Sequence, residues 1–195
     1  YERGFAPPSS RLPIYIAALN PGMLGLAGEL ADGIIMNLVT PPYLAEARGI
    51  IAERAQRAGR DPGQIKLGSY VLCSLSDNEA EALEVIQDMI AHYARDPFYE
   101  AMLRRAGFGD ALDEMADPLE RGDLARAAAM IPEAMASALT MYGSKDRCQA
   151  TLDGLAQAGL QLAVLHPQMP KGTDHLKAIG ELIDAFADAH HGGAK

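Results

Sequence analysis

Four short apolar runs, each followed by a stretch with helical periodicity, constrain the fold of this chain most strongly. Each run is bounded by proline, glycine or polar residues and is shorter than an ordinary helix, as expected of strands buried on both faces. The runs occupy residues 14–19, 32–39, 65–75 and 160–167. Strands that alternate with helices in this way predict an α/β fold built on a parallel sheet.

The segment 13–37, PIYIAALNPGMLGLAGELADGIIMN, shows the alternation clearly. Asn20 is a favoured N-cap residue, and Pro21 suits the first helical position, where its missing N–H costs nothing. Apolar residues then recur at i, i+3, i+4 and i+7 and define one helix face: Met23, Leu26, Ala27 and Leu30. The segment therefore predicts one strand–helix–strand unit with a polar turn after its first strand.

Helix signals also follow the second and third strands. Thr40 and Pro41 predict the start of a helix, and Gly59 is suited to the C′ position that ends it. Residues 76–79 read Ser-Asp-Asn-Glu, a capping-box sequence that predicts a helix reaching about Arg95.

The alternation stops between residues 96 and 141, where only short helical pieces are predicted and Pro132 interrupts one of them. We interpret 96–141 as a helical insertion without a strand. Ser144 then caps a further helix, which is followed by the strand at 160–167 and a closing helix over 174–190. The chain, 1–195, is accordingly predicted to be a single domain that contains this insertion.

Two parallel architectures remain open, a doubly wound sheet and part of a (β/α)8 TIM barrel. No Gly-x-Gly-x-x-Gly follows any strand, which argues against a dinucleotide-binding version of the first. A complete barrel takes about 250 residues, with a floor near 200, so four strand–helix units amount to half of one. Half a barrel has two open edges, so alone it is expected to dimerise, to close differently or to be unstable.

Charge and composition limit the partners of the protein. Its net charge is −9, and its basic residues are scattered apart from Arg104 and Arg105, which argues against nucleic acid or an anionic membrane as a partner. No apolar run approaches the roughly 20 residues of a membrane helix, and no signal peptide is visible. We therefore expect a cytoplasmic protein with a small-molecule ligand.

The cysteines and histidines do not predict a metal site. Cys73 and Cys148 fit no metal-ligand spacing and are interpreted as ordinary reduced thiols. The paired histidines at 190–191 have no third ligand in view and are expected to lie in a frayed tail. The chain opens with Tyr1 in a stretch that reads as a loop, so we expect it to be part of a longer protein.

The segment 13–37 contains a strand ending in Ala-Ala, a turn through proline into a helix, and Ala-Asp-Gly before the next strand. Further along, in order, come RAGRDPGQIKLGSYVLCSLSDNEAEA, FYEAMLRRAGFG and YGSKDRCQATLDGLAQAGLQLAVLHP. Over residues 12–167 this ordered set resembles the luciferase-like monooxygenase superfamily. It is most similar to the deazaflavin-dependent branch, the methylene-tetrahydromethanopterin reductase-like oxidoreductases.

The resemblance implies that the four strands are the last four of a (β/α)8 barrel whose cofactor lies at the carboxyl ends of the strands. It implies hydride transfer between coenzyme F-420 and a small organic substrate, with FMN as the alternative cofactor, as in an FMN-dependent monooxygenase of the same superfamily. The family's acid/base residues generally lie on the earlier strands, which this chain lacks. A non-catalytic half-barrel, either a fragment or a subunit of a dimer, is therefore the rival hypothesis. An unrelated parallel α/β binding protein is a third.

The resemblance also implies a set of cofactor-binding residues at the first two strand ends. Ala17 and Ala18 would let a flat ring or a ribityl chain approach the first strand end closely. Leu19 and Asn20 form the turn that would direct helix N–H groups at a phosphate, although Asn20 replaces the glycine common in the family. The second strand end adds two residues, Asn37 and Thr40, and Thr40 stands where some deazaflavin enzymes have lysine.

Other candidates lie at the last two strands and in the insertion. His166 ends the last strand and is a candidate acid/base or hydrogen-bond donor. Either Ser69 or Tyr70 should point inward from the third strand, and periodicity does not decide which. Aromatic and apolar residues of the insertion either line a substrate pocket or, as we expect, pack in a core: Tyr93, Phe98, Tyr99, Met102 and Phe108.

Overall fold

The computed structural model describes residues 12–170 and 172–187, so the opening loop and the histidines at 190–191 lie outside the described residues. The strands are β1 (Tyr15–Ala17), β2 (Gly33–Asn37), β3 (Lys66–Leu75), β4 (Met141–Gly143) and β5 (Leu162–Pro167). The four predicted strands are confirmed with slightly narrower bounds. The three-residue strand β4 was not predicted.

Most of the predicted helices begin where their capping residues predict. They are α1 (Pro21–Leu30), α2 (Pro41–Arg57), the 3-10 turn η1 (Pro62–Gln64), α3 (Glu79–Ala94), α4 (Pro97–Leu103), the π-helical turn η2 (Arg104–Phe108), α5 (Gly109–Glu114), α6 (Ala116–Glu120), α7 (Leu124–Ala129), α8 (Glu133–Leu139), α9 (Lys145–Gln157) and α10 (His175–Phe186). Asn20, Thr40 and Ser144 cap α1, α2 and α9. The capping box before α3 is wrong in detail, because Asn78 is the N-cap and the Ser76 hydroxyl accepts from the Asn78 N–H.

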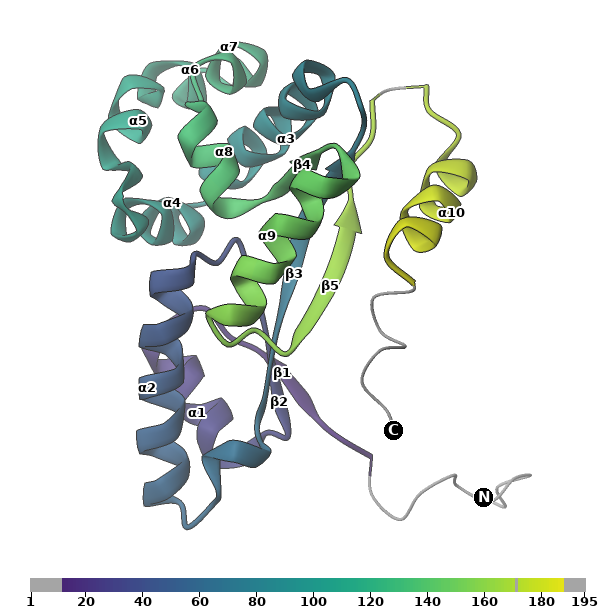
Figure 1. The fold of residues 1–195 in the computed structure, drawn as a ribbon. Helices are drawn as coiled ribbons and strands as arrows, with labels where there is room; N and C mark the ends of the chain where they lie inside the picture. Colours follow the sequence, from purple (N-terminus) through teal and green to yellow (C-terminus); the bar gives the residue numbers. More distant parts are fainter. Residues whose placement is uncertain (1–11, 171, 188–195) are drawn as a thin grey trace, which may run out of the picture.

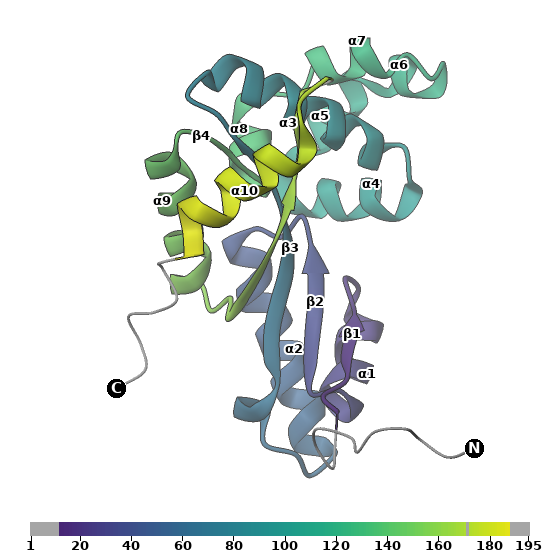
Figure 2. The ribbon, with the colours of Figure 1, turned by 90° about the vertical axis from the view of Figure 1, so that its right-hand side faces the viewer.

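Strand β3 is the centre of an all-parallel sheet. Residues 68–70 of β3 pair with both β2 and β5, so those two strands lie on opposite edges of it. Cys73 pairs with both β4 and β5, which places the short strand β4 beyond the end of β2 on the same edge. Strand β1 pairs with the outer edge of β2. Apart from the short strand β4, the strands lie side by side in the order β1-β2-β3-β5, which is their order along the chain (Figure 2).

Helices cover one face of this sheet. Ile34, Met36, Val71 and Cys73 alternate along β2 and β3 and are buried in one apolar cluster. Residues of α1, α2, α9 and α10 complete that cluster, among them Leu24, Ile51, Leu155 and Leu182. A second cluster joins α3 to the insertion helices α4–α8, which lie together beyond the carboxyl ends of β2 and β3 (Figure 1).

The opposite face, here called the open face, has the side chains of Tyr15, Ile35, Tyr70, Leu162 and His166. The strand pairing places all of these residues on the same face of the sheet, opposite to the face that the helices cover. Tyr15 and Tyr70 are 40% and 48% exposed, and Leu162 is 40% exposed. Chain-order strands with helices on one face differ from a doubly wound sheet, in which the order reverses and helices cover both faces. Consecutive barrel strands have this arrangement.

Both lateral edges of the sheet expose apolar residues. On α1 the exposed stripe is Met23, Leu26 and Leu30, and on α10 it is Leu176, Ile179 and Ile183. Exposed stripes at i, i+3 and i+7 are the usual packing faces of helices. No helix in the described part of the chain is long and apolar enough to cross a membrane.

Close packing of α1 against α2 fixes the first two units. Gly28 lies against the α2 backbone, where an added Cβ would come within 2.7 Å of the Ile51 carbonyl oxygen. The Arg60 guanidinium then donates to the Gly28 and Ala31 carbonyls at 2.7 and 2.5 Å, which satisfies the carboxyl end of α1.

We expect Gly28→Ala to destabilise the protein by about 1–3 kcal/mol, because a methyl group there must push the two helices apart. Gly49→Ala, on α2 with open space around it, is the matched control and should stabilise by about 0.5 kcal/mol. Urea unfolding measures both. A Gly28→Ala variant as stable as the control would contradict this account of the contact.

Candidate functional site

Three polar side chains lie on the open face: Asn37 at the end of β2, His166 near the end of β5, and Tyr70 in the middle of β3 between them. Asn37 of β2 pairs with Tyr70 of β3, and His166 of β5 pairs with Leu72, two residues further along β3. The rings of Tyr70 and His166 have centroids 6.1 Å apart and are tilted by 59°. Because ligands of parallel α/β proteins bind at the carboxyl ends of the strands, these three residues define the candidate site.

Asn37 is the best-defined polar group of this site. It is only 8% exposed, and its amide nitrogen donates to the Tyr99 hydroxyl at 3.1 Å. Its Oδ1 atom is buried and has no hydrogen-bond partner among the described residues. Leu38, which follows, has a φ of +51° and is the non-glycine residue of the described chain in the left-handed region. Such strain is typical of functional sites.

The β1–α1 turn is tightly held. Ala17 is exposed on the open face, whereas Ala18 is buried and donates its N–H to the Ile35 carbonyl at 3.2 Å. The Asn20 side chain accepts from the Met23 N–H at 2.9 Å. The hydroxyl of Tyr43, on α2, donates to the Leu19 carbonyl. Burial raises the pKa of Tyr43, which keeps this donor protonated.

Neither predicted helix start offers a set of free N–H groups. Helix α2 begins with Pro41 and Pro42, which have no N–H, and Thr40 accepts from the Tyr43 N–H at 3.4 Å. In α1, Pro21 lacks the donor and the Met23 N–H is occupied by the cap. A phosphate at these turns therefore gains few donors from the helix starts, and a donor from elsewhere in the structure would complete its binding.

Arg105 is a candidate for that donor, and the sequence analysis did not predict it. Its guanidinium carbon lies over the Tyr43 ring, 5.6 Å from the centroid. The neighbouring Arg104 is committed to ion pairs with Glu100 and Asp113 at 2.9 and 2.7 Å. Arg105 has no carboxylate partner in the part of the chain that the structure describes. The insertion thus brings a cation to the β1–α1 turn.

His166 is exposed at the end of β5 and is oriented by its neighbour Gln168. The Gln168 amide nitrogen lies 3.3 Å from His166 Nδ1 and 3.2 Å from the His166 carbonyl oxygen. An amide N–H only donates, so in this contact Nδ1 accepts and the ring proton is on Nε2. That tautomer presents a hydrogen-bond donor at the open face.

The sequence of the chain matches a known family over most of its length. The family model described as luciferase-like monooxygenase aligns with residues 2–162. The chain belongs to the luciferase-like monooxygenase family.

Individual members of the family are also similar to this chain. The 5,10-methylenetetrahydromethanopterin reductase of Methanolobus tindarius is 31% identical over 176 residues, which are 88% of this chain and 53% of the relative. The structure of the coenzyme F-420-dependent tetrahydromethanopterin reductase from Methanopyrus kandleri is 29% identical, with a TM-score of 0.74, and covers 88% of this chain and 49% of that one. The chain spans about half the length of the curated relatives it matches.

A more distant structure shares the fold alone. An F-420-dependent secondary alcohol dehydrogenase, in complex with an F-420–acetone adduct, has a TM-score of 0.63 at 18% identity. It covers 91% of this chain and 50% of that chain. The parallel α/β fold of this luciferase-like chain is therefore that of solved F-420-dependent proteins.

The remaining sequence candidates separate into surface and core. Tyr70 points to the open face, whereas Ser69 is fully buried and donates to the Tyr70 carbonyl at 2.9 Å. Most of the aromatic and apolar candidates belong to the second apolar cluster: Tyr93, which lies in α3 and not in the insertion, and Tyr99, Met102 and Phe108. Phe98 is exposed. Core packing of the insertion is thus the correct interpretation for all but Phe98, and Tyr99 also contacts the site.

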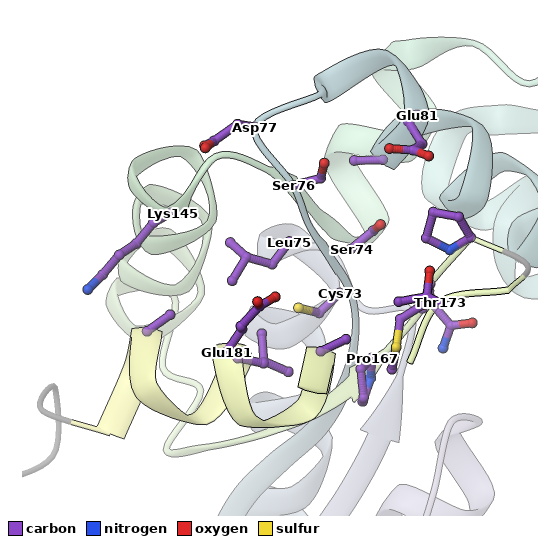
Figure 3. A pocket seen from close by; sticks show the side chains of 17 residues that line it. Cys73, Ser74, Leu75, Ser76, Asp77, Glu81, Lys145, Pro167, Thr173 and Glu181 are labelled. Carbon is purple, nitrogen blue, oxygen red and sulfur yellow. The ribbon is translucent and has the colours of Figure 1, made fainter. Parts of the chain in front are cut away.

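A cavity of about 570 Å³ lies at the other side of the β3 end, under α10. Figure 3 shows Cys73, Ser74 and Leu75 of β3 in its wall, with Glu181 of α10 nearby. Lys145 is its cationic residue, against the carboxylates of Asp77, Glu81 and Glu181. This charge balance disfavours a phosphate ligand. Within residues 12–170 and 172–187, no group of three metal-ligating side chains lies together.

The thiols of this luciferase-like chain are both buried. Burial raises the pKa of Cys73 to about 12 and that of Cys148 to about 11, from 9.0. The Cys148 thiol donates to the Gly143 carbonyl at 3.6 Å. Protonated, buried thiols are poor nucleophiles, so neither cysteine is a candidate for catalysis.

These shifts predict an alkaline loss of stability. Above about pH 9 the thiols ionise in the unfolded chain but remain protonated in the folded one, so unfolding is favoured as the pH rises toward 11–12. Each thiol adds a slope of about 1.4 kcal/mol per pH unit in that window. The unfolding midpoint should therefore fall less steeply between pH 9 and 11 in Cys73→Ala/Cys148→Ala than in the wild type. Equal slopes would contradict the burial of the thiols.

Proposed function

We propose that this chain is the cofactor-binding part of an oxidoreductase that transfers hydride between coenzyme F-420 and a small organic substrate. The observation that carries the proposal is the similarity of 88% of the chain to the structure of a reductase that is named as dependent on this coenzyme. When bound, such a cofactor supplies the hydride chemistry, while the protein binds, orients and excludes water.

The residues at the first two strand ends fit such a cofactor. Ala17 exposes only a methyl group at the end of β1, which leaves room for a flat ring or a ribityl chain. Asn37, at the end of the adjacent strand, has a buried oxygen without a partner among the described residues. The proposed contact set is therefore Ala17, Ala18, Leu19, Asn20, Asn37 and Thr40. In this set Asn20 and Thr40 act through the turns that they cap.

The phosphate of the cofactor is proposed to lie near Arg105. The helix starts after β1 and β2 offer few free N–H groups, because both begin with proline and the capping side chains occupy further amides. Arg105 lies over the Tyr43 ring, and the Tyr43 hydroxyl donates to the Leu19 carbonyl in the β1–α1 turn. The guanidinium is therefore next to that turn. A guanidinium without a carboxylate partner is a suitable counter-charge for phosphate.

His166 is proposed to donate a hydrogen bond to the substrate through Nε2, with Gln168 fixing the tautomer. Its position at the end of β5 puts it two strands away from Asn37 along the same face. The acid/base residues of the family are expected on strands outside this chain.

The same proposal includes the (β/α)8 barrel. Among the described residues, β1 and β5 are the edge strands of the sheet, and the helices beside them, α1 and α10, have exposed apolar stripes. A further half-barrel, from a longer chain or from a second copy in a homodimer, would bury both. A cytoplasmic location is part of this proposal.

Two alternatives compete with this function. An FMN-dependent monooxygenase of the same family would use the same strand ends with a different cofactor. A non-catalytic half-barrel would bind neither cofactor. Cofactor titration separates all three.

We expect the protein to bind coenzyme F-420 more tightly than FMN in a fluorescence titration. Ala17→Leu should weaken that binding at least about tenfold, since the larger side chain occupies the open face at the β1 end. Ala129→Leu, at an exposed alanine of α7, is the control and should bind like the wild type. Tighter binding of FMN would favour the monooxygenase alternative, and binding of neither would favour the non-catalytic one.

Arg105→Gln tests the phosphate position. The variant should bind FMN about three- to tenfold more weakly than the wild type and riboflavin equally well, because only FMN has the phosphate. Arg126→Gln removes the same charge from another exposed position of the insertion and should change neither affinity. Equal losses of affinity for FMN and riboflavin in Arg105→Gln would show that Arg105 does not bind the phosphate.

A further inference from the structure

We propose that Asn37 is a hydrogen-bond acceptor for an O–H or N–H group of the bound cofactor, and that Tyr99 of the insertion holds it in position. The inference rests on the proposed function and names the kind of cofactor atom that the end of β2 recognises. A ribityl hydroxyl and a ring N–H both belong to this class, whereas a phosphate oxygen does not.

The side-chain oxygen of Asn37 is unpaired among the described residues. Its side chain is more than nine-tenths buried, and its Oδ1 atom has no partner among the described residues. Buried polar atoms are nearly always hydrogen-bonded, because an unpaired one loses its water without replacing it. A partner supplied by a ligand explains why the atom is retained at the end of a strand.

The hydrogen bond to Tyr99 fixes the orientation of the Asn37 amide. Its nitrogen donates to the Tyr99 hydroxyl at 3.1 Å, so the oxygen is the atom left for a ligand. The Tyr99 ring is itself fixed by aromatic neighbours, with centroids 4.6 Å from Tyr93 and 5.8 Å from Phe98. Helix α4 of the insertion therefore sets the direction of a side chain on β2.

The backbone directly after Asn37 is strained at Leu38. Leu38 adopts a φ of +51° although its side chain is buried in the second apolar cluster. This conformation costs free energy for a residue with a branched side chain. The strained residue and the unpaired oxygen are adjacent, which is the pattern expected of a preorganised binding position.

The chemistry of the free atom selects the ligand group. An amide oxygen only accepts hydrogen bonds, and ionised phosphate oxygens also only accept, so the two do not pair. Arg105 is the better partner for phosphate. Asn37 is thereby assigned to the ring or to the polyol chain, a role different from the phosphate contact that the family resemblance implies for this strand end.

Affinity measurements on two variants test the class of ligand atom. Asn37→Leu keeps the shape of the side chain but removes the acceptor, and should weaken coenzyme F-420 binding about tenfold. Asn37→Thr keeps an uncharged acceptor oxygen and should lose less affinity than Asn37→Leu. An Asn37→Thr loss as large as that of Asn37→Leu would overturn the acceptor assignment.

A ligand series then separates the two possible donors. Lumiflavin has the ring without the polyol, and riboflavin has both. If Asn37→Leu weakens both ligands equally, the donor is a ring N–H. If it weakens only riboflavin, the donor is a ribityl hydroxyl. Either result supports the proposal, and an unchanged affinity for both ligands and for coenzyme F-420 would overturn it.

Unfolding of the ligand-free protein gives a readout that does not depend on activity. Tyr99→Phe leaves both polar atoms of the buried Asn37 amide unpaired, so its urea midpoint should fall below that of the wild type. Asn37→Leu/Tyr99→Phe removes both partners, so its midpoint should return to the wild-type value or above it. Tyr93→Phe removes a neighbouring hydroxyl outside this contact and is the control.

The outcomes distinguish this inference from the proposed function. If the wild type binds neither coenzyme F-420 nor a flavin, the proposed function fails and the inference fails with it. If the wild type binds and Asn37→Leu binds equally well, only the inference fails. A double variant less stable than Tyr99→Phe would show that Oδ1 is already satisfied in the free protein, which also overturns the inference.

Discussion

The hydrogen-bonded register of strand β3 is the constraint on which the rest of this structure depends. β3 pairs with β2, β4 and β5, and only β1 reaches the sheet through another strand. A parallel register with side chains alternating between faces determines which residues are buried by helices and which are open. A shift by one residue would bury Tyr70 and expose Val71, so the core and the candidate site are specified together.

The same register explains how distant segments form one site. Asn37, Tyr70 and His166 come from three strands separated by long helical connections, yet lie in neighbouring rows of the open face. The insertion then adds Tyr99 and Arg105 from beyond the strand ends. Its helices α4–α8 form a second apolar cluster with α3, which gives them a rigid position over the sheet. In this account the insertion both closes and orients the site.

Sequence patterns predicted the strands, most helix caps and the parallel α/β class, because these depend on local periodicity and capping. The short strand β4 was not predictable, since three residues have no periodicity and β4 forms only by pairing with the end of β3. The candidate residues were named from a resemblance, but their partners were not. The Tyr99–Asn37, Arg105–Tyr43 and Gln168–His166 contacts arise from tertiary packing, although the adjacent Arg104 and Arg105 formed a visible signal.

The central claim is that a cofactor of the flavin or deazaflavin class binds at the carboxyl ends of β1 and β2. Amide hydrogen exchange, with and without saturating coenzyme F-420, tests it most directly, because exchange reports on each segment separately. The account predicts slower exchange for peptides that cover 17–20 and 37–40, and for α4 around Tyr99, with little change at the amino ends of the strands. Protection confined to the cavity beneath α10, or no protection in any segment, would contradict it.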